Sequence, residues 1–175
     1  GMPSAPSGMG EHIRCSFRAL QAAGITASLM DISPSRTPAW PHFDLDLKKF
    51  LVSQMSAGIK IFNINGNDIE GVLNNFQDAL PAGSYRIIYP LWELENYPRE
   101  WARQLDRFDE IWAPSRFILN SLQKAVSRPV FHMPLATEVK LTAFYGRAYF
   151  KIPESSYLFL FFFDLSSYLQ RKNPC

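Results

Sequence analysis

The C-terminal stretch of the sequence joins an apolar run to two adjacent cations. Residues 157–163 are apolar without interruption and mostly aromatic, a pattern typical of a strand buried on both faces in a parallel sheet. A polar turn beginning at Asp164 leads to Arg171 and Lys172. Cations just beyond the carboxyl end of a strand lie where open α/β sheets bind ligands, and their chemistry suits a phosphate or diphosphate. The alternative is a solvated basic pair near the end of the chain.

Polar side chains also follow the strand that we expect over residues 59–65. Asn65, Asn67 and Asp68 fall where this strand turns into the next helix. Asn and Asp are ordinary N-cap residues, so capping accounts for one of the three. The excess of polar groups at this turn indicates a cleft.

A third candidate follows the strand expected over residues 85–89. Trp92 and Glu93 place a flat apolar ring beside a carboxylate, a combination that can hold a sugar ring. A core Trp beside a surface Glu fits the same sequence equally well. Further along the chain, Ser115 opens a helix whose first N–H groups could bind an anion, although its simpler role is that of an N-cap.

A glycine-bearing loop near the start of the chain is the fourth candidate. Gly8 and Gly10 precede a helix expected over residues 10–23, and Asp31 lies at roughly the distance where a dinucleotide-binding fold keeps its ribose-binding acid. The third glycine of that fingerprint is absent and no strand precedes the loop, so a dinucleotide-binding domain is only an alternative. Arg14, one turn along the helix, faces either the cleft or a surface carboxylate.

The elements that must position these residues alternate along the chain. Strands are expected at residues 25–32, 59–65, 85–89, within 108–115 and at 129–134, and helices at 10–23, 44–54 and from about 69, 98 and 115 onward. This alternation predicts an α/β, Rossmann-like, doubly wound fold with a mostly parallel sheet. Such a fold normally begins with a strand, which Pro3 and Pro6 cannot supply, so we expect the first strand to be missing.

Four ordered segments resemble family 4 (group 1) glycosyltransferases. They are residues 7–14, 89–98, 109–117 and 159–174. In that family the matching Arg and Lys of the last segment contact the diphosphate of a nucleotide-sugar donor, so the resemblance implies this role for Arg171 and Lys172. It likewise implies that Gly8, Gly10 and Glu11 belong to a loop whose backbone N–H groups approach the donor phosphates or the acceptor.

The resemblance further implies one half of a two-domain glycosyltransferase. The N-terminal, acceptor-side domain would span residues 1–135, a linker residues 136–156, and the start of the donor-binding domain residues 157–175. Its reaction would be sugar transfer with retention from a nucleotide sugar to a glycan or other acceptor, without a metal or cofactor. The family's paired glutamates would lie beyond Cys175, so we expect this fragment to be inactive by itself.

The composition of the chain indicates which kinds of partner and which cellular compartment to expect. The net charge is +2 over 175 residues with no long run of like charges, so a nucleic-acid partner is not expected. No apolar stretch is long enough to span a bilayer, and no secretory leader is visible. Only 2 cysteines occur, without metal-binding spacing, so we expect a reduced cytoplasmic protein.

A non-enzymatic interaction module is the third hypothesis. Aromatic residues make up 14% of the chain, a surplus that can mark a partner surface. Under this hypothesis the apolar strand at residues 157–163 is a site of self-association.

Overall fold

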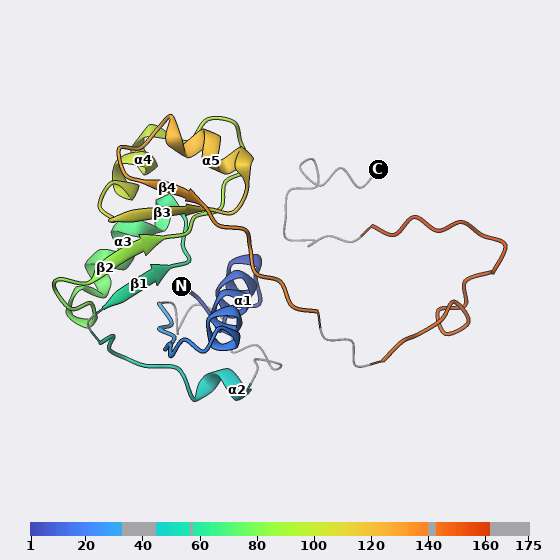
Figure 1. Ribbon diagram of the computed structural model, residues 1–175. Helices are drawn as coiled ribbons and strands as arrows, with labels where there is room; N and C mark the ends of the chain where they lie inside the picture. Colours follow the sequence, from blue (N-terminus) through green and yellow to red (C-terminus); the bar gives the residue numbers. More distant parts are fainter. Residues whose placement is uncertain (33–44, 57, 140–142, 162–175) are drawn as a thin grey trace. The chain divides into compact units, whose positions relative to one another are not determined.

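The computed structural model of the protein describes residues 1–32, 45–56, 58–139 and 143–161 (Figure 1). Contacts along the chain divide it into two compact units, Gly1–Glu138 and Val139–Cys175. The first unit contains all the helices and strands of the described residues.

A parallel sheet of 4 strands forms the centre of the first unit. Its strands lie side by side in chain order: β1 (Ile59–Phe62), β2 (Tyr85–Ile88), β3 (Glu110–Ala113) and β4 (Val130–His132). Ile61 pairs with Ile87, and Ile88 pairs with Ile111. Parallel sheets are covered on their faces, which is why their strands are rich in β-branched apolar residues. The chain therefore has an α/β, Rossmann-like fold with a parallel sheet, and the predicted fold class is confirmed.

Helices connect the successive strands and bury the sheet. These are α3 (Ile69–Asn75), α4 (Arg99–Leu105) and α5 (Arg116–Gln123), with 3-10 turns η1 (Gly66–Asp68) and η2 (Gln77–Ala79) at the two ends of α3. Their apolar faces and the strands share one core, in which Ile64, Ile69, Ile88, Leu105, Ile111 and Leu122 are fully buried. The apolar residues that recur with helical spacing thus form the faces of the helices that pack on the sheet.

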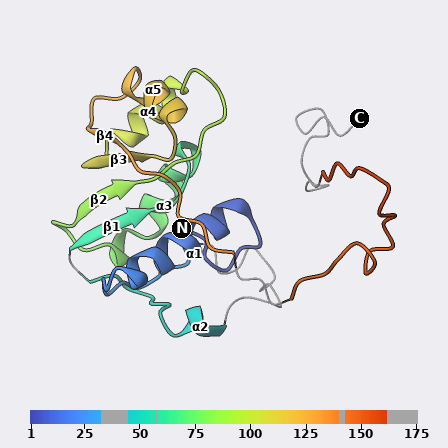
Figure 2. The ribbon, with the colours of Figure 1, turned by 45° about the vertical axis from the view of Figure 1, so that its right-hand side comes forward.

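Helix α1 (Gly8–Ala22) lies beside β1, and the N-terminus lies between the two in both views (Figures 1 and 2). Gly24 ends this helix with a φ of 73°, the left-handed conformation that glycine adopts without strain. The helix contributes Ile13 and Phe17 to a second, smaller core cluster with Leu29 and Leu47.

Two predicted elements of the first unit are much shorter in the structure than predicted. The helix predicted over residues 44–54 is only α2 (Leu45–Lys48). It ends in a turn at residues 49–50, after which the chain pairs with Leu29: Leu29 N–H donates to the Phe50 carbonyl, and Val52 N–H donates to the Leu29 carbonyl, both at 2.8 Å. The strand predicted over residues 25–32 is correspondingly reduced to one parallel bridge, Leu29 to Leu51.

The described residues of the second unit, 139 and 143–161, contain no helix or strand. Tyr145 and Tyr149 stack with ring centroids 4.2 Å apart, and Arg147 donates to the carbonyls of Pro153 and Ser156. The predicted terminal strand is wrong over residues 157–161, which are exposed and belong to no sheet of the described chain. A strand is stable only when it is paired, and apolar composition alone does not supply a partner.

No helix among the described residues is long and apolar enough to cross a membrane.

Gly66 allows the turn after β1 to approach α4, and this contact provides a test of the fold. A Cβ at Gly66 would lie 2.5 Å from Tyr97 Oη and 2.6 Å from Trp101 Cβ, both of which are packed in place. We expect Gly66→Ala to lower the free energy of unfolding by about 1–3 kcal/mol in urea titrations followed by circular dichroism.

The matched control is Gly71→Ala in α3, where a Cβ would meet nothing within 4 Å. Because alanine favours helix, this variant should be unchanged or more stable by up to about 1 kcal/mol. Equal loss of stability in the two variants would contradict the close packing of the turn on α4.

Candidate functional site

The candidate site is the edge of the sheet at which the strands end. The turns that follow β1, β2 and β3 carry Asn65, Trp92 and Ser115, respectively. Because the strands are parallel, their carboxyl ends meet at one edge, and open α/β sheets bind ligands there.

Asn65 joins two of these turns directly. Its Oδ1 accepts a hydrogen bond of 3.0 Å from the Leu91 N–H, so its half-buried side chain links the end of β1 to the end of β2. Asp68 is different, because its side chain makes no capping hydrogen bond to α3, and its Oδ1 accepts a bond of 3.2 Å from Asn67 Nδ2. Neither residue therefore caps a helix through its side chain, and Asp68 presents a half-buried carboxylate at this turn.

Trp92 is held in an aromatic cluster with Tyr97 and Trp101. The ring centroids of Tyr97 and Trp101 each lie 5.3 Å from that of Trp92, and both contacts are edge-to-face. The indole N–H of Trp92 donates to the Asn96 carbonyl at 3.0 Å. Such contacts fix the orientation of a ring whose remaining surface is accessible, and the neighbouring Glu93 is exposed.

Ser115 is an N-cap. Its Oγ accepts a hydrogen bond of 3.2 Å from the Ile118 N–H at the start of α5. The simpler of the two roles considered for Ser115 is the one observed, and its hydroxyl is engaged by the helix.

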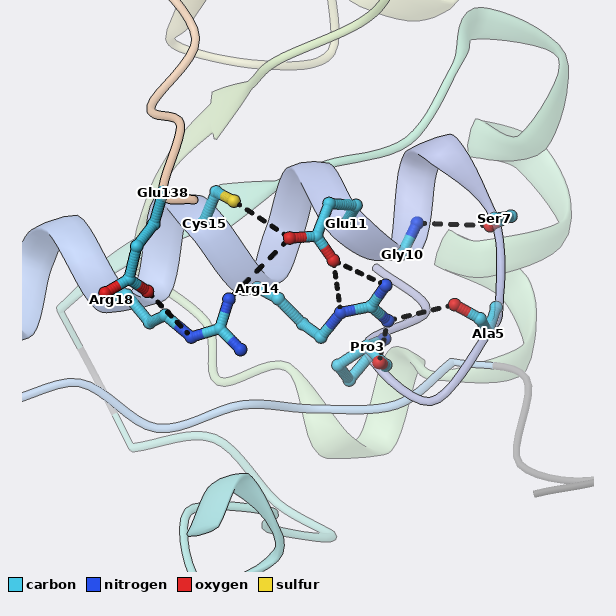
Figure 3. A network of polar contacts seen from close by, with 9 residues as sticks. All are labelled: Pro3, Ala5, Ser7, Gly10, Glu11, Arg14, Cys15, Arg18 and Glu138. Carbon is cyan, nitrogen blue, oxygen red and sulfur yellow. Dashed lines mark hydrogen bonds and ion pairs between the residues drawn. The ribbon is translucent and has the colours of Figure 1, made fainter. Parts of the chain in front are cut away.

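The glycine loop is packed against α1 by a buried arginine (Figure 3). The Arg14 side chain is 4% exposed, and its Nη1 donates to the carbonyls of Pro3 at 2.7 Å and Ala5 at 3.0 Å. A Cβ at Gly10 would lie 2.1 Å from the Ala5 carbonyl oxygen, whereas a Cβ at Gly8 would meet nothing within 4 Å. Gly10 is therefore needed for packing, whereas Gly8 has open space around it. Both glycines lie in the first turn of α1, where a loop was expected, because Ser7 caps the helix at this point.

Glu11 connects this loop to the rest of α1. Its carboxylate accepts hydrogen bonds from Arg14 Nε at 2.9 Å and from Cys15 Sγ at 3.2 Å, and it lies 3.7 Å from Arg18 Nη1. Burial raises the pKa of Glu11, but the hydrogen bonds from Cys15 and Arg14 and the charges of Arg14 and Arg18 outweigh it, so the net shift is downward. Arg18 also lies 3.5 Å from Glu138, which ties the segment after β4 to α1.

Sequence reasoning missed a buried polar group between α1 and the sheet. His12 Nε2 lies 3.1 Å from Asn63 Nδ2, and the His12 ring meets the Tyr89 ring edge-on at 4.4 Å. Burial lowers the pKa of His12, and a backbone contact with Tyr89 opposes part of this shift. The run Phe-Asn-Ile-Asn at residues 62–65 was the available signal, because it places a polar side chain at Asn63 directly after a largely apolar strand.

The structure thus brings the predicted residues together in two groups. Asn65, Asp68, Trp92 and Glu93 lie on the turns after β1 and β2, and Gly10, Glu11 and Arg14 form the network on α1. Arg171 and Lys172, the predicted diphosphate ligands, lie outside the described residues. Within the described part of the chain, no cluster of three metal-ligating side chains occurs.

The fold and this edge define the class of the molecule as an α/β protein of Rossmann-like type with a candidate ligand edge at the carboxyl ends of its strands. Comparisons of the chain with protein-family models, with curated proteins and with solved structures found no match.

The packing role of Arg14 predicts a large loss of stability on its removal. We expect Arg14→Met, which keeps the apolar stem, to lower the free energy of unfolding by roughly 2–4 kcal/mol, because the buried carbonyls of Pro3 and Ala5 lose their charged donor. Arg18→Met is the control, since Arg18 is more exposed and its ion pairs are longer; its loss should stay below about 1 kcal/mol. Similar losses in both variants, measured in urea, would contradict the special role of Arg14.

The burial of His12 predicts a pH dependence of folding. Because the pKa of His12 is lower in the folded chain than its ordinary value of 6.5, the unfolded chain binds a proton first as the pH falls. Stability that is present above pH 6.5 should therefore be lost below it, with a slope of at most about 1.4 kcal/mol per pH unit for one proton.

We expect His12→Gln to flatten this slope between pH 7 and pH 5, whereas His132→Gln, at an exposed site, should leave it unchanged. The charge of the N-terminal amine also lowers the pKa of His12, and burial lowers the pKa of the amine to about 5, so the amine accounts for part of the slope that remains in His12→Gln. An unchanged slope in His12→Gln would show that His12 is not the titrating group.

Proposed function

We propose that this chain is the acceptor-side half of a nucleotide-sugar-dependent glycosyltransferase, with the acceptor at the carboxyl edge of the sheet. The observation that carries the proposal is the link between Asn65 and the backbone of Leu91, which sets a side-chain amide beside the turn that bears Trp92 and Glu93. An amide, a flat ring and a carboxylate are the groups that bind sugar hydroxyls and the apolar face of a sugar ring.

The roles of the other residues come from the sequence resemblance. Arg171 and Lys172 would neutralise the diphosphate of the donor and stabilise it as a leaving group when charge develops on it. Gly8, at the start of α1, has open space around it where a phosphate or acceptor group could approach the backbone.

The hydrogen bonds of Arg14 support the proposal because they order the residues that precede α1. Since the guanidinium holds the carbonyls of Pro3 and Ala5 against α1, the loop is held in one conformation before any ligand arrives. A loop ordered in advance binds a ligand at a lower entropic cost. Reduced cytoplasm is the compartment we propose, because Cys15 is a buried free thiol in the described chain.

Ligand-observed NMR on the 175-residue chain tests both halves of the proposal. The probes are a panel of neutral mono- and disaccharides, the nucleoside diphosphates UDP, GDP and ADP, and the nicotinamide dinucleotides. We expect at least one saccharide to bind weakly, in the millimolar range near about 1 mM. Glu93→Gln should weaken that binding at least about fivefold, by removing a charged acceptor, whereas Glu70→Gln on α3 makes the same charge change elsewhere and should not.

Binding of a nucleoside diphosphate should in turn be lost when Arg171 and Lys172 are both changed to Ala, with saccharide binding unaffected. Absence of any saccharide binding, or a loss that is equal in Glu93→Gln and Glu70→Gln, would reject the acceptor site. Binding of a nicotinamide dinucleotide in preference to the other probes would replace the proposal with a dinucleotide-binding domain.

A further inference from the structure

Among the described residues, β1 is the edge strand of the sheet, and only β2 pairs with it. In a parallel strand, the backbone groups of alternate residues point to opposite neighbours. The carbonyls of Gly58 and Phe62 accept hydrogen bonds from Tyr85 and Tyr89 of the β2 segment. The N–H and C=O groups of Ile59, Ile61 and Asn63 must therefore point to the other side, away from β2.

A second row of backbone groups belongs to the segment before residue 33. Leu29 directs both its N–H and its C=O to residues 50–52, so the groups of Ser28, Met30 and Ile32 point the opposite way by the same alternation. The Ile32 N–H confirms this direction, because it donates to the Gly1 carbonyl at 3.0 Å.

Gly1 lies between the two rows. Its carbonyl accepts a hydrogen bond from Ile32 on one side. On the other side, a Cβ atom added to Gly1 would lie 2.8 Å from the Asn63 carbonyl oxygen. One residue of extended chain thus spans the distance between the segment at residue 32 and the end of β1. At the amino ends of the two rows, Ile25 is 51% exposed and Ile59 is 69% exposed.

The buried apolar residues of the described chain form two clusters, and Ile32 packs against the larger one. The core around β1–β4 and the cluster of Ile13, Phe17, Leu29 and Leu47 are separate groups of buried residues. A domain ordinarily has one contiguous core, and smaller satellite clusters can accompany it. An apolar element between the two rows would contact both groups.

We propose that the channel between residues 28–32 and β1 is a docking site for one extended apolar segment that runs parallel to β1 and is joined at its carboxyl end to Gly1. Gly1 would be the last residue of the docked strand, because its carbonyl already accepts a hydrogen bond from the Ile32 N–H. The segment would become the central strand of a sheet in which Leu51, Leu29, the docked strand and β1–β4 lie in succession, all parallel. Both of its faces are covered, so its side chains are β-branched and apolar, and a length of about five residues matches the neighbouring strands.

The charge at Gly1 supports this assignment. Burial lowers the pKa of the Gly1 amine to about 5, and Asp31 offsets only part of this effect. An ammonium group is unfavourable in that position, whereas a peptide N–H in its place carries no charge and would point toward the row of Met30.

Extending the chain before Gly1 tests the proposal. One protein carries a Val- and Ile-rich extension of about five residues, a second carries Gly and Ser over the same length, and a third is the 175-residue chain itself. We expect the first to raise the Tm by about 5 °C or more over both others. The same Val/Ile sequence, added as a free peptide to the 175-residue chain, should raise the Tm in a concentration-dependent way and by less.

Amide hydrogen exchange locates the effect. In the 175-residue chain the amides of Ile59 and Ile61 should exchange faster than those of Lys60 and Phe62, which already pair with β2. The Val/Ile extension should slow Ile59 and Ile61 at least about tenfold and bring them close to Lys60 and Phe62. A Tm gain without slower exchange at Ile59 and Ile61, or equal exchange with the Gly/Ser extension, would overturn the proposal.

Discussion

The pairing of backbone groups between parallel strands is the constraint on which the rest of this structure depends. Buried N–H and C=O groups need partners, and neighbouring strands from β1 to β4 supply them to one another in chain order. The connecting helices then have to cross back over the sheet, and their apolar faces close the core. The turns at the carboxyl ends follow from the same constraint, because parallel strands deliver all of their exits to one edge.

Buried polar side chains then make that edge rigid. The hydrogen bond from the Leu91 N–H to Asn65 connects the turn after β1 to the turn after β2. The contact between His12 and Asn63 connects α1 to the end of β1. Arg14 does the same for the residues before α1, where it supplies the donor that two carbonyls would otherwise lack. His12, Asn63 and Arg14 are buried and Asn65 is half-buried, so these polar groups stabilise one arrangement of the edge rather than simply adding apolar area.

The sequence predicts those parts of the fold that depend on local pattern. The strand expected within residues 59–65, the helix expected from about residue 115 and the cap at Ser115 are all local, and the structure has β1, α5 and the cap at these places. Residues 50–52 were mispredicted as helix, because their pairing with Leu29 is formed over more than twenty residues of intervening chain and overrides the helical spacing. The contact of His12 with Asn63 likewise could not be predicted from local sequence, since the two residues are 51 positions apart. Arg14 shows a further limit: a cation on a helix gives no sign in the sequence of whether it faces a carboxylate or the backbone of its own chain.

The open edge of β1 matters for the site as well as for stability. Helix α1 carries His12, Glu11 and Arg14, yet its cluster of Ile13 and Phe17 is separate from the main core. Its observed contacts with the sheet include the ring contact of His12 with Tyr89, the polar contact of His12 with Asn63, and the packing around Gly1. A strand in the channel would pack under α1 and join the two cores, which would fix the glycine loop relative to Asn65 and Trp92. Any ligand that contacts both groups needs this fixed spacing, because a displacement of about 1 Å at a binding site is enough to weaken it substantially. Docking of that strand would therefore complete the sheet and fix the spacing of the site residues in the same step.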